Sequence, residues 1–170
     1  MNISSIIAEK KENNLKLKKA LWILLKFKPL WLVKLSDKEL TNDLIEWLKQ
    51  LPTWFVVYIE NEDTMIISNN IVITWELDDS VVSWFDFVIC DDDTDSLNIF
   101  IEKWITPIMI RNNHLASILK EFNPLKNEWN AFFYENMNKW DIFFTIVRYI
   151  ENFKFPYDNK NLVNNVINWE

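Results

Sequence analysis

Acidic side chains are the most frequent chemically active groups in the middle of this sequence. Asp91, Asp93, Asp95 and Glu102 stand at positions 1, 3, 5 and 12 of one segment, which is the spacing of the carboxylate ligands in an EF-hand calcium loop. Position six of that loop makes a sharp turn and is glycine, whereas here it is Ser96. The residues before the segment also favour a strand rather than a helix. We therefore predict that the segment binds no calcium and that the chain has no metal site.

Few residues are suited to nucleophilic catalysis. His114 is the only histidine, so any pair or metal site that needs two imidazoles is excluded. Cys90 is the only cysteine, and the field of the three aspartates that follow it disfavours the thiolate. The chain contains no glycine, which removes the usual forms of the P-loop, the GxGxxG turn and the nucleophile elbow. These absences predict a protein that is not an enzyme and uses no cofactor.

Charge is distributed unevenly along the chain. From Gln50 through Glu102 there are twelve acidic residues and no Lys or Arg. A negative field favours basic partners and speeds their encounter, while Trp side chains are frequent anchors at interfaces. We therefore predict that this segment binds a basic protein. The predicted contacts are six acidic residues and two tryptophans: Asp78, Asp79, Asp91, Asp92, Asp93, Asp95, Trp75 and Trp84.

This profile predicts a non-enzymatic inhibitor that occludes the site of its basic partner, as an immunity protein neutralises a nuclease-type toxin. A phage-encoded inhibitor that mimics the charge of nucleic acid is the alternative, and a calcium-binding or structural subunit is less favoured. The net charge of −7 disfavours nucleic acid as a partner. The lack of a long apolar run predicts no membrane contact. The lone cysteine and the lack of a signal-peptide pattern predict a cytoplasmic protein.

The hydrophobic spacing predicts which elements position these residues. Helical periodicity runs from Asn14 to Lys28, and Ser36 with Glu39 forms a capping-box pattern that begins a second helix before Pro52. Short polar groups then separate four apolar runs, which predicts an antiparallel β-meander. The predicted strands are Trp54–Ile59, Met65–Ile67, Ile71–Leu77 and Val81–Ile89.

After these runs the period becomes helical again. One helix is predicted from Thr94 until Pro107, a short one over 113–122, a long aromatic one after Pro124, and a terminal one around Leu162. The predicted fold class is therefore α+β, with the meander packed against N- and C-terminal helices. The predicted organisation is a single globular domain over residues 1–170, helical over 1–52, β-meander over 53–89 and mostly helical over 94–170.

Overall fold

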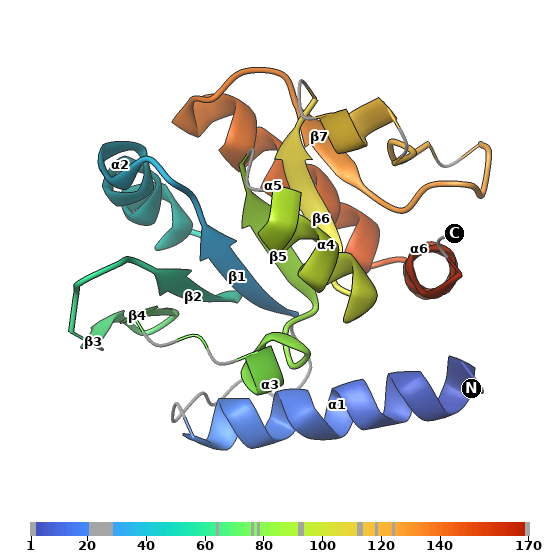
Figure 1. Cartoon of the computed structure of the whole chain (residues 1–170), viewed down its shortest axis with the longest axis horizontal. Helices are drawn as coiled ribbons and strands as arrows, with labels where there is room; N and C mark the ends of the chain where they lie inside the picture. The colour runs from blue at the N-terminus through green and yellow to red at the C-terminus, as the bar shows by residue number, and fades with distance from the viewer. Residues whose placement is uncertain are drawn as a thin grey trace. The chain divides into compact units, whose positions relative to one another are not determined.

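The computed structural model describes residues 3–20, 29–63, 65–75, 77, 79–91, 94–111, 114–117, 119–123 and 125–168 (Figure 1). The chain divides into two compact units, Met1–Val88 and Ile89–Glu170. The elements of unit 1 are α1 (Ile3–Ala20), β1 (Leu30–Lys34), α2 (Lys38–Leu48), β2 (Trp54–Tyr58), β3 (Met65–Ser68), β4 (Ile71–Thr74) and α3 (Asp79–Val82). Strand β5 (Phe87–Cys90) crosses the boundary between the units. The elements of unit 2 are α4 (Thr94–Glu102), β6 (Thr106–Ile110), the 3₁₀ helix η1 (His114–Ser117), β7 (Phe132–Tyr134), α5 (Lys139–Phe153) and α6 (Pro156–Ile167).

The strands form a seven-stranded sheet in the order β3-β4-β2-β1-β5-β6-β7. Strand β2 pairs in parallel with β1 and with β4, and β6 pairs in parallel with β7. Strand β3 is antiparallel to β4. Without β3, the remaining strands follow the order 3-2-1-4-5-6 in chain sequence, which is the order of a doubly wound, Rossmann-like sheet.

This architecture contradicts the predicted antiparallel meander. The run over 81–89 is not one strand, because helix α3 ends at Val82 and β5 begins at Phe87. Three strands were also missed: β1, β6 and β7. The apolar runs of β1, β2 and β5 have four consecutive buried side chains each, rather than an alternation of buried and exposed ones. Continuous burial is typical of parallel strands that are covered on both faces.

The helices were predicted with mixed success. Helix α2 forms where expected, although its N-cap is Asp37, whose side chain accepts a hydrogen bond from Leu40 N (2.9 Å). Pro107 lies inside strand β6 instead of ending a helix. The predicted long aromatic helix after Pro124 is wrong in its first part, because Phe132 belongs to β7 and helix α5 begins only at Lys139.

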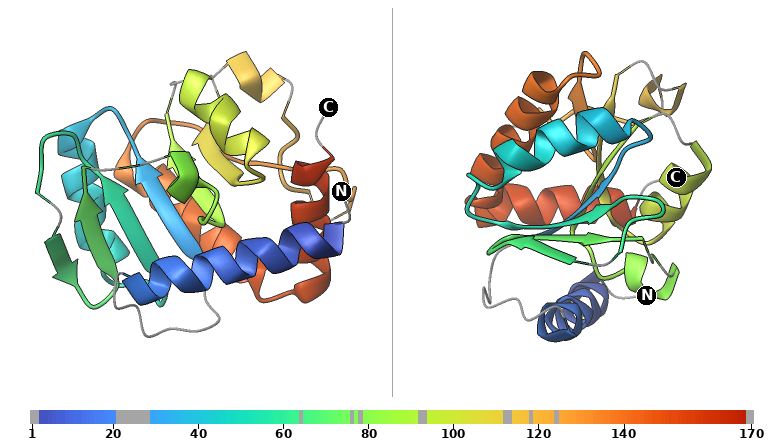
Figure 2. Two further views of the ribbon diagram at one scale, coloured as in Figure 1. Left: turned by 60° about the horizontal axis from the view of Figure 1, so that its bottom comes forward. Right: turned by 90° about the vertical axis from the view of Figure 1, so that its left-hand side faces the viewer.

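In unit 2, α4 covers one face of the strands and α5 the other (Figures 1 and 2). The predicted helix over 14–28 continues into residues outside the described part.

Helix α1 is held to unit 1 by a half-buried carboxylate. Asp86 Oδ2 accepts hydrogen bonds from Leu30 N (2.8 Å) and from the Asn14 side chain (3.0 Å). Lys10, Asn14 and Lys18 follow one another at intervals of four residues, so they lie on one stripe of α1. Burial raises the pKa of Asp86, and the charge of Lys10 opposes that shift. Burial lowers the pKa of Lys10 to about 8 although Asp86 opposes the shift.

No helix within the described ranges is long and apolar enough to cross a membrane. This finding agrees with the absence of a long apolar run in the sequence.

The lowered pKa of Lys10 predicts a pH dependence of folding. The unfolded chain keeps the Lys10 proton up to about pH 10.5, whereas the folded chain releases it near pH 8. Between these values the unfolded state binds more protons, so the free energy of unfolding should rise with pH. We expect Lys10→Met to reduce this rise, and Lys11→Met, which changes an exposed lysine of the same helix, to leave it unchanged. Urea denaturation at pH 7 and pH 9.5 tests this. An equal rise of the free energy of unfolding between these two pH values in both variants would contradict the prediction.

Asn152 of α5 predicts a stabilising substitution. This residue is 4% exposed, and among the described residues neither its amide nitrogen nor its side-chain oxygen has a hydrogen-bond partner. Because an unsatisfied buried amide costs free energy, Asn152→Leu should raise the free energy of unfolding by about 1–2 kcal/mol. The matched control is Asn159→Leu, which removes the acceptor of the Tyr149 hydroxyl (3.0 Å) and should destabilise. Urea unfolding at pH 7 measures both changes. The interpretation fails if the two variants shift stability in the same direction.

Candidate functional site

Side chains that could bind a ligand or take part in a reaction follow the carboxyl ends of the strands in unit 2. Asp91 comes directly after β5, Arg111 after β6 and Glu135 after β7. Because β6 and β7 are parallel and pair Ile110 with Tyr134, Arg111 and Glu135 leave the sheet next to each other. Ligands of open α/β sheets bind outside this edge. The carboxyl edge is therefore the first place to look for a binding site.

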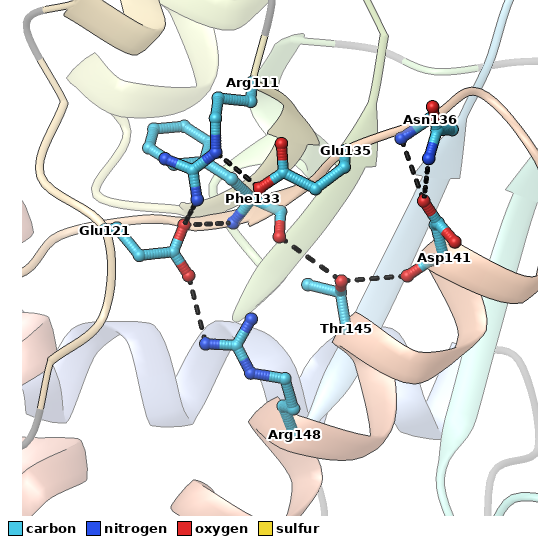
Figure 3. A network of polar contacts seen from close by, with 8 residues as sticks. All are labelled: Arg111, Glu121, Phe133, Glu135, Asn136, Asp141, Thr145 and Arg148. Atoms are coloured by element: carbon cyan, nitrogen blue, oxygen red, sulfur yellow. Dashed lines mark hydrogen bonds and ion pairs between the residues drawn. The ribbon is translucent and has the colours of Figure 1, made fainter.

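Four charged residues form one network at this edge, which we call the carboxyl-edge cluster: Arg111, Glu121, Glu135 and Arg148 (Figure 3). Arg111 donates from Nε to Glu135 (2.6 Å) and from Nη2 to Glu121 (3.1 Å). Arg148, on α5, donates to the other oxygen of Glu121 (3.1 Å). The Glu121 carboxylate thus joins two guanidinium groups from different elements.

Strand β7 carries this cluster. The backbone N–H of Phe133 donates to the Glu121 carboxylate (3.1 Å), and the Arg111 guanidinium lies 5.0 Å from the centre of the Phe133 ring. A cation above an aromatic face at this distance is attracted by the ring. Glu121 itself lies on a short parallel bridge to Ala131. The cluster therefore links the last strand, the segment beside it and helix α5.

The charges of the cluster are set by burial and by neighbouring groups. Burial raises the pKa of Glu121, and the guanidinium groups of Arg148 and Arg111 oppose that shift. The hydrogen bond to Glu135 raises the pKa of Arg111, so Arg111 remains a cation at every pH of interest. Its side chain is 45% exposed, compared with 35% for that of Arg148. Arg111 is therefore the cation of the cluster that is most open to solvent.

The loop from β7 to α5 is ordered by local hydrogen bonds. Asn138 caps α5 by accepting from Trp140 N and Asp141 N, both at 3.0 Å. Asp141 accepts from the backbone and the side chain of Asn136, at 3.0 and 2.7 Å (Figure 3). Thr145 donates to the Asp141 carbonyl (2.9 Å). An edge loop held in this way presents its side chains in a defined arrangement.

Strands β5 and β7 are also joined at the carboxyl edge by a buried bond. The Tyr134 hydroxyl donates to the Cys90 carbonyl (2.8 Å). Burial raises the pKa of Tyr134, and the nearby Cys90 and Asp91 act in the same direction. Tyr134 therefore remains a neutral donor. The Cys90 side chain is buried and forms no disulfide.

The structure does not gather the residues predicted to contact a partner. Trp75 follows the carboxyl end of β4, whereas the Trp84 carbonyl accepts from Asn14 of α1 (3.1 Å), beside the amino end of β1. The two proposed anchors thus lie at opposite ends of the unit 1 strands. Asp91 is buried, at 4% exposure, rather than part of a solvated face.

Other predicted contacts are placed only in part. Asp79 begins α3 and Asp95 lies in the first turn of α4. Asp78, Asp92 and Asp93 lie outside the described residues. Because Asp92 and Asp93 belong to the acidic loop, the prediction that this loop binds no calcium stays a prediction. The binding of a basic partner also stays a prediction.

Sequence reasoning missed the carboxyl-edge cluster. One signal could have revealed it: the chain has sixteen lysines but only two arginines, Arg111 and Arg148. Both arginines bind the same carboxylate. The planar guanidinium offers several donors in fixed directions, and a lysine cannot replace it in such a network. Rare arginines in a lysine-rich chain therefore mark a position where donor geometry matters.

The cluster is suited to the recognition of an anion. Arg111 combines permanent charge, partial exposure and a position at the carboxyl edge, and arginine recognises phosphate and carboxylate groups through parallel hydrogen bonds. Across the described part of the chain, no group of three or more His, Cys, Asp or Glu side chains could hold a metal ion. The chemistry that these residues offer is charge stabilisation.

Solved structures show where this fold occurs. One is the catalytic domain of starch synthase IV from Arabidopsis thaliana, bound to ADP and acarbose. The match covers 100% of this chain and 41% of the starch synthase chain, with a TM-score of 0.76 and 15% sequence identity. The structure that explains EarP-mediated arginine glycosylation of translation elongation factor EF-P matches 97% of this chain and 64% of its own, with a TM-score of 0.58 and 11% identity. This chain therefore spans less than two thirds of either structure. No protein-family model and no curated protein matches the sequence.

These likenesses correct the predicted function. A seven-stranded, mostly parallel Rossmann-like sheet that resembles one domain of GT-B glycosyltransferases replaces the α+β meander. The predictions of a non-enzymatic inhibitor, of the immunity type or of the phage type, are contradicted, because the whole chain matches enzyme domains. The absence of glycine motifs and of a second histidine predicted a protein that is not an enzyme, but these absences do not prevent the chain from forming an enzyme-like α/β fold.

Loss of the central carboxylate of the cluster should destabilise unit 2. Glu121→Ala leaves Phe133 N–H and the half-buried Arg148 without their acceptor, which should lower the free energy of unfolding by about 2 kcal/mol. Glu128→Ala is the matched control, since it breaks only an exposed pair with Lys120 (3.1 Å) and should change stability by less than about 0.5 kcal/mol. Urea denaturation gives both values. Equal losses would show that the cluster is no more than a set of surface ion pairs.

Proposed function

We propose that this chain is a glycosyltransferase-like enzyme domain. The observation that carries the proposal is the match of the entire chain to the starch synthase IV catalytic domain, at a TM-score of 0.76. The strand order supports it independently, because doubly wound sheets of this order bind ligands outside their carboxyl edge. Fold alone does not determine function, so the proposal also depends on the residues at that edge.

The substrate class that we propose is a nucleoside diphosphate linked to a sugar. ADP is bound in the starch synthase IV structure, and glycosyl transfer from such a donor leaves a diphosphate that gains negative charge as the bond breaks. Preorganised cations stabilise developing charge of this kind. Arg111 is the exposed cation that follows β6, at the edge where such a ligand would lie.

The absence of glycine makes a side-chain cation more important here. Rossmann-like domains commonly hold phosphate groups through the backbone of a glycine-rich turn. This chain cannot build such a turn in its usual form because it has no glycine. A side chain can take over part of that role, and Arg111 is the residue we assign to phosphate binding.

Because this chain spans 41% and 64% of the two matched structures, we propose that it supplies the donor-binding part of a larger catalytic unit. Transfer to an acceptor would then need residues that this chain does not contribute. Donor binding is the activity that can be tested on the chain as it stands.

Nucleotide binding tests the proposed function. ADP, GDP and UDP should be added separately, up to millimolar concentration, while the melting temperature is followed. At least one should raise the melting temperature progressively, because a ligand that binds only the folded state stabilises it. Isothermal titration then gives the dissociation constant. The absence of binding by all three diphosphates would overturn the proposal.

The role of Arg111 needs a charge-matched control. Arg111→Met should weaken binding of the diphosphate by at least about tenfold, the loss expected for one charged hydrogen bond. Lys120→Met removes one positive charge from an exposed ion pair nearby in sequence and should change binding less than about twofold. If the diphosphate binds and both variants weaken it equally, the anion site is diffuse and Arg111 has no specific role.

A further inference from the structure

Strand β3 forms the outer margin of unit 1. It is the first strand of the sheet order and pairs on one side only, with β4. Figures 1 and 2 show it at the outside of this unit, with no further strand beyond it among the described segments. The outer backbone N–H and C=O groups of such a strand can pair with another extended chain.

The side chains of β3 are apolar and exposed. Met65 is 42% exposed and Ile66 is 64% exposed, although they point to opposite faces of the strand. Folded proteins usually protect edge strands with lysine or proline, and β3 contains neither. Its protection consists of its short length and an irregularity in pairing between Ile66 and Ser68.

An exposed tryptophan extends this apolar edge. The register pairs Met65 with Ile73, so Trp75, two residues further along, lies near the Met65 end of β3. Trp75 is 49% exposed. We call Met65, Ile66 and Trp75 the β3 edge patch. Because Met65 and Ile66 lie on opposite faces of the sheet, a strand added at this edge meets apolar side chains on both faces.

Two exposed acidic residues lie at one end of the β3 edge patch, in a turn whose third acid, Glu62, pairs with Lys38. Glu60 and Asp63 are exposed in the turn that leads to β3, and Ile59 N donates to the Thr74 carbonyl (3.0 Å), which brings this turn beside Trp75. No Lys or Arg occurs between Gln50 and Glu102. The exposed carboxylates of Glu60 and Asp63 attract a basic segment.

We propose that the β3 edge patch binds an extended, basic segment of a partner protein by strand addition. The backbone of the segment pairs with the outer edge of β3, its apolar side chains contact Ile66 and Trp75, and its lysines or arginines face Glu60 and Asp63. This interaction involves no residue of the carboxyl-edge cluster. It assigns a specific surface to the basic partner that the charge pattern predicts.

The test uses, as the probe, a heptapeptide with blocked ends in which lysines flank four consecutive valines, so that apolar side chains reach both faces of β3. The ¹⁵N-labelled full chain is titrated with this peptide at low salt. We expect amide shifts concentrated at residues 65–68 and 75, and a dissociation constant that rises with salt. The matched peptide with glutamate in place of lysine should bind at least about tenfold more weakly. A peptide methylated at alternate backbone nitrogens should also bind more weakly, because it cannot form the ladder of hydrogen bonds.

Charge-neutral variants identify the surface. The double variant Ile66→Thr/Trp75→Ala should weaken peptide binding at least about tenfold. Leu125→Thr, which changes an apolar residue of unit 2 that is 92% exposed, should not alter it. Far-UV circular dichroism confirms that each variant is folded. If the double variant fails to fold, the single variant Ile66→Thr replaces it with an expected loss of about threefold.

Three results would overturn the proposal. The first is no binding of the lysine peptide at millimolar concentration. The second is equal binding of the lysine and glutamate peptides, or shifts confined to other residues. The third is a concentration-dependent dimer in sedimentation that Ile66→Thr dissociates, because β3 would then pair with a second copy of the chain.

Discussion

Burial of parallel strands on both faces is the constraint on which this structure depends. The apolar runs of β1, β2 and β5 leave no side free for water, so helices must cover both sides of such strands. Parallel pairing in turn requires a crossover between strands, and α2 provides one between β1 and β2. In unit 1 the strands β1, β2 and β4 therefore end at one edge, and in unit 2 the strands β6 and β7 do the same. The position of Arg111 and Glu135 side by side is a consequence of this topology.

The second constraint is the absence of glycine. Positions with left-handed backbone are filled by Asn61, Asn127 and Trp104, with φ values of 62°, 49° and 59°. Asparagine tolerates this conformation because its short side chain can bond locally, whereas tryptophan adopts it at a cost of about 1–2 kcal/mol. Trp104 lies just after α4, where Ile105 N bonds back to the Phe100 carbonyl (3.0 Å), a helix ending that usually contains glycine. The fold therefore does not require glycine, even though the usual phosphate turn does.

Charged residues are placed at both ends of the strands, but their surroundings differ. Near the amino end of β1, the Asp86 carboxylate accepts hydrogen bonds from a backbone N–H and from a side-chain amide. Burial raises the pKa of Asp86 and lowers that of Lys10, which favours the neutral form of each group. At the carboxyl end of β6, the Arg111 side chain stays half exposed and charged. Buried groups of the first kind hold elements together, whereas Arg111 keeps its charge at the surface, where an anionic ligand would compete with Glu121 and Glu135 for its donors.

Local sequence patterns determined the elements whose signals are short-range. Helices α2 and α4 and the strands β2 and β3 were predictable from periodicity and capping, and the lack of a long apolar run agrees with the absence of a membrane-crossing helix in the described ranges. The pairing of those strands was not predictable, because whether neighbouring runs form hairpins or cross over depends on contacts between residues far apart in sequence. For the same reason the convergence of Arg111 and Arg148 on Glu121, 27 residues from Arg148, could not be read from spacing. Tertiary structure alone decided that these three residues meet, since a carboxylate becomes the partner of two guanidinium groups only when a strand end, an edge segment and a helix are packed together.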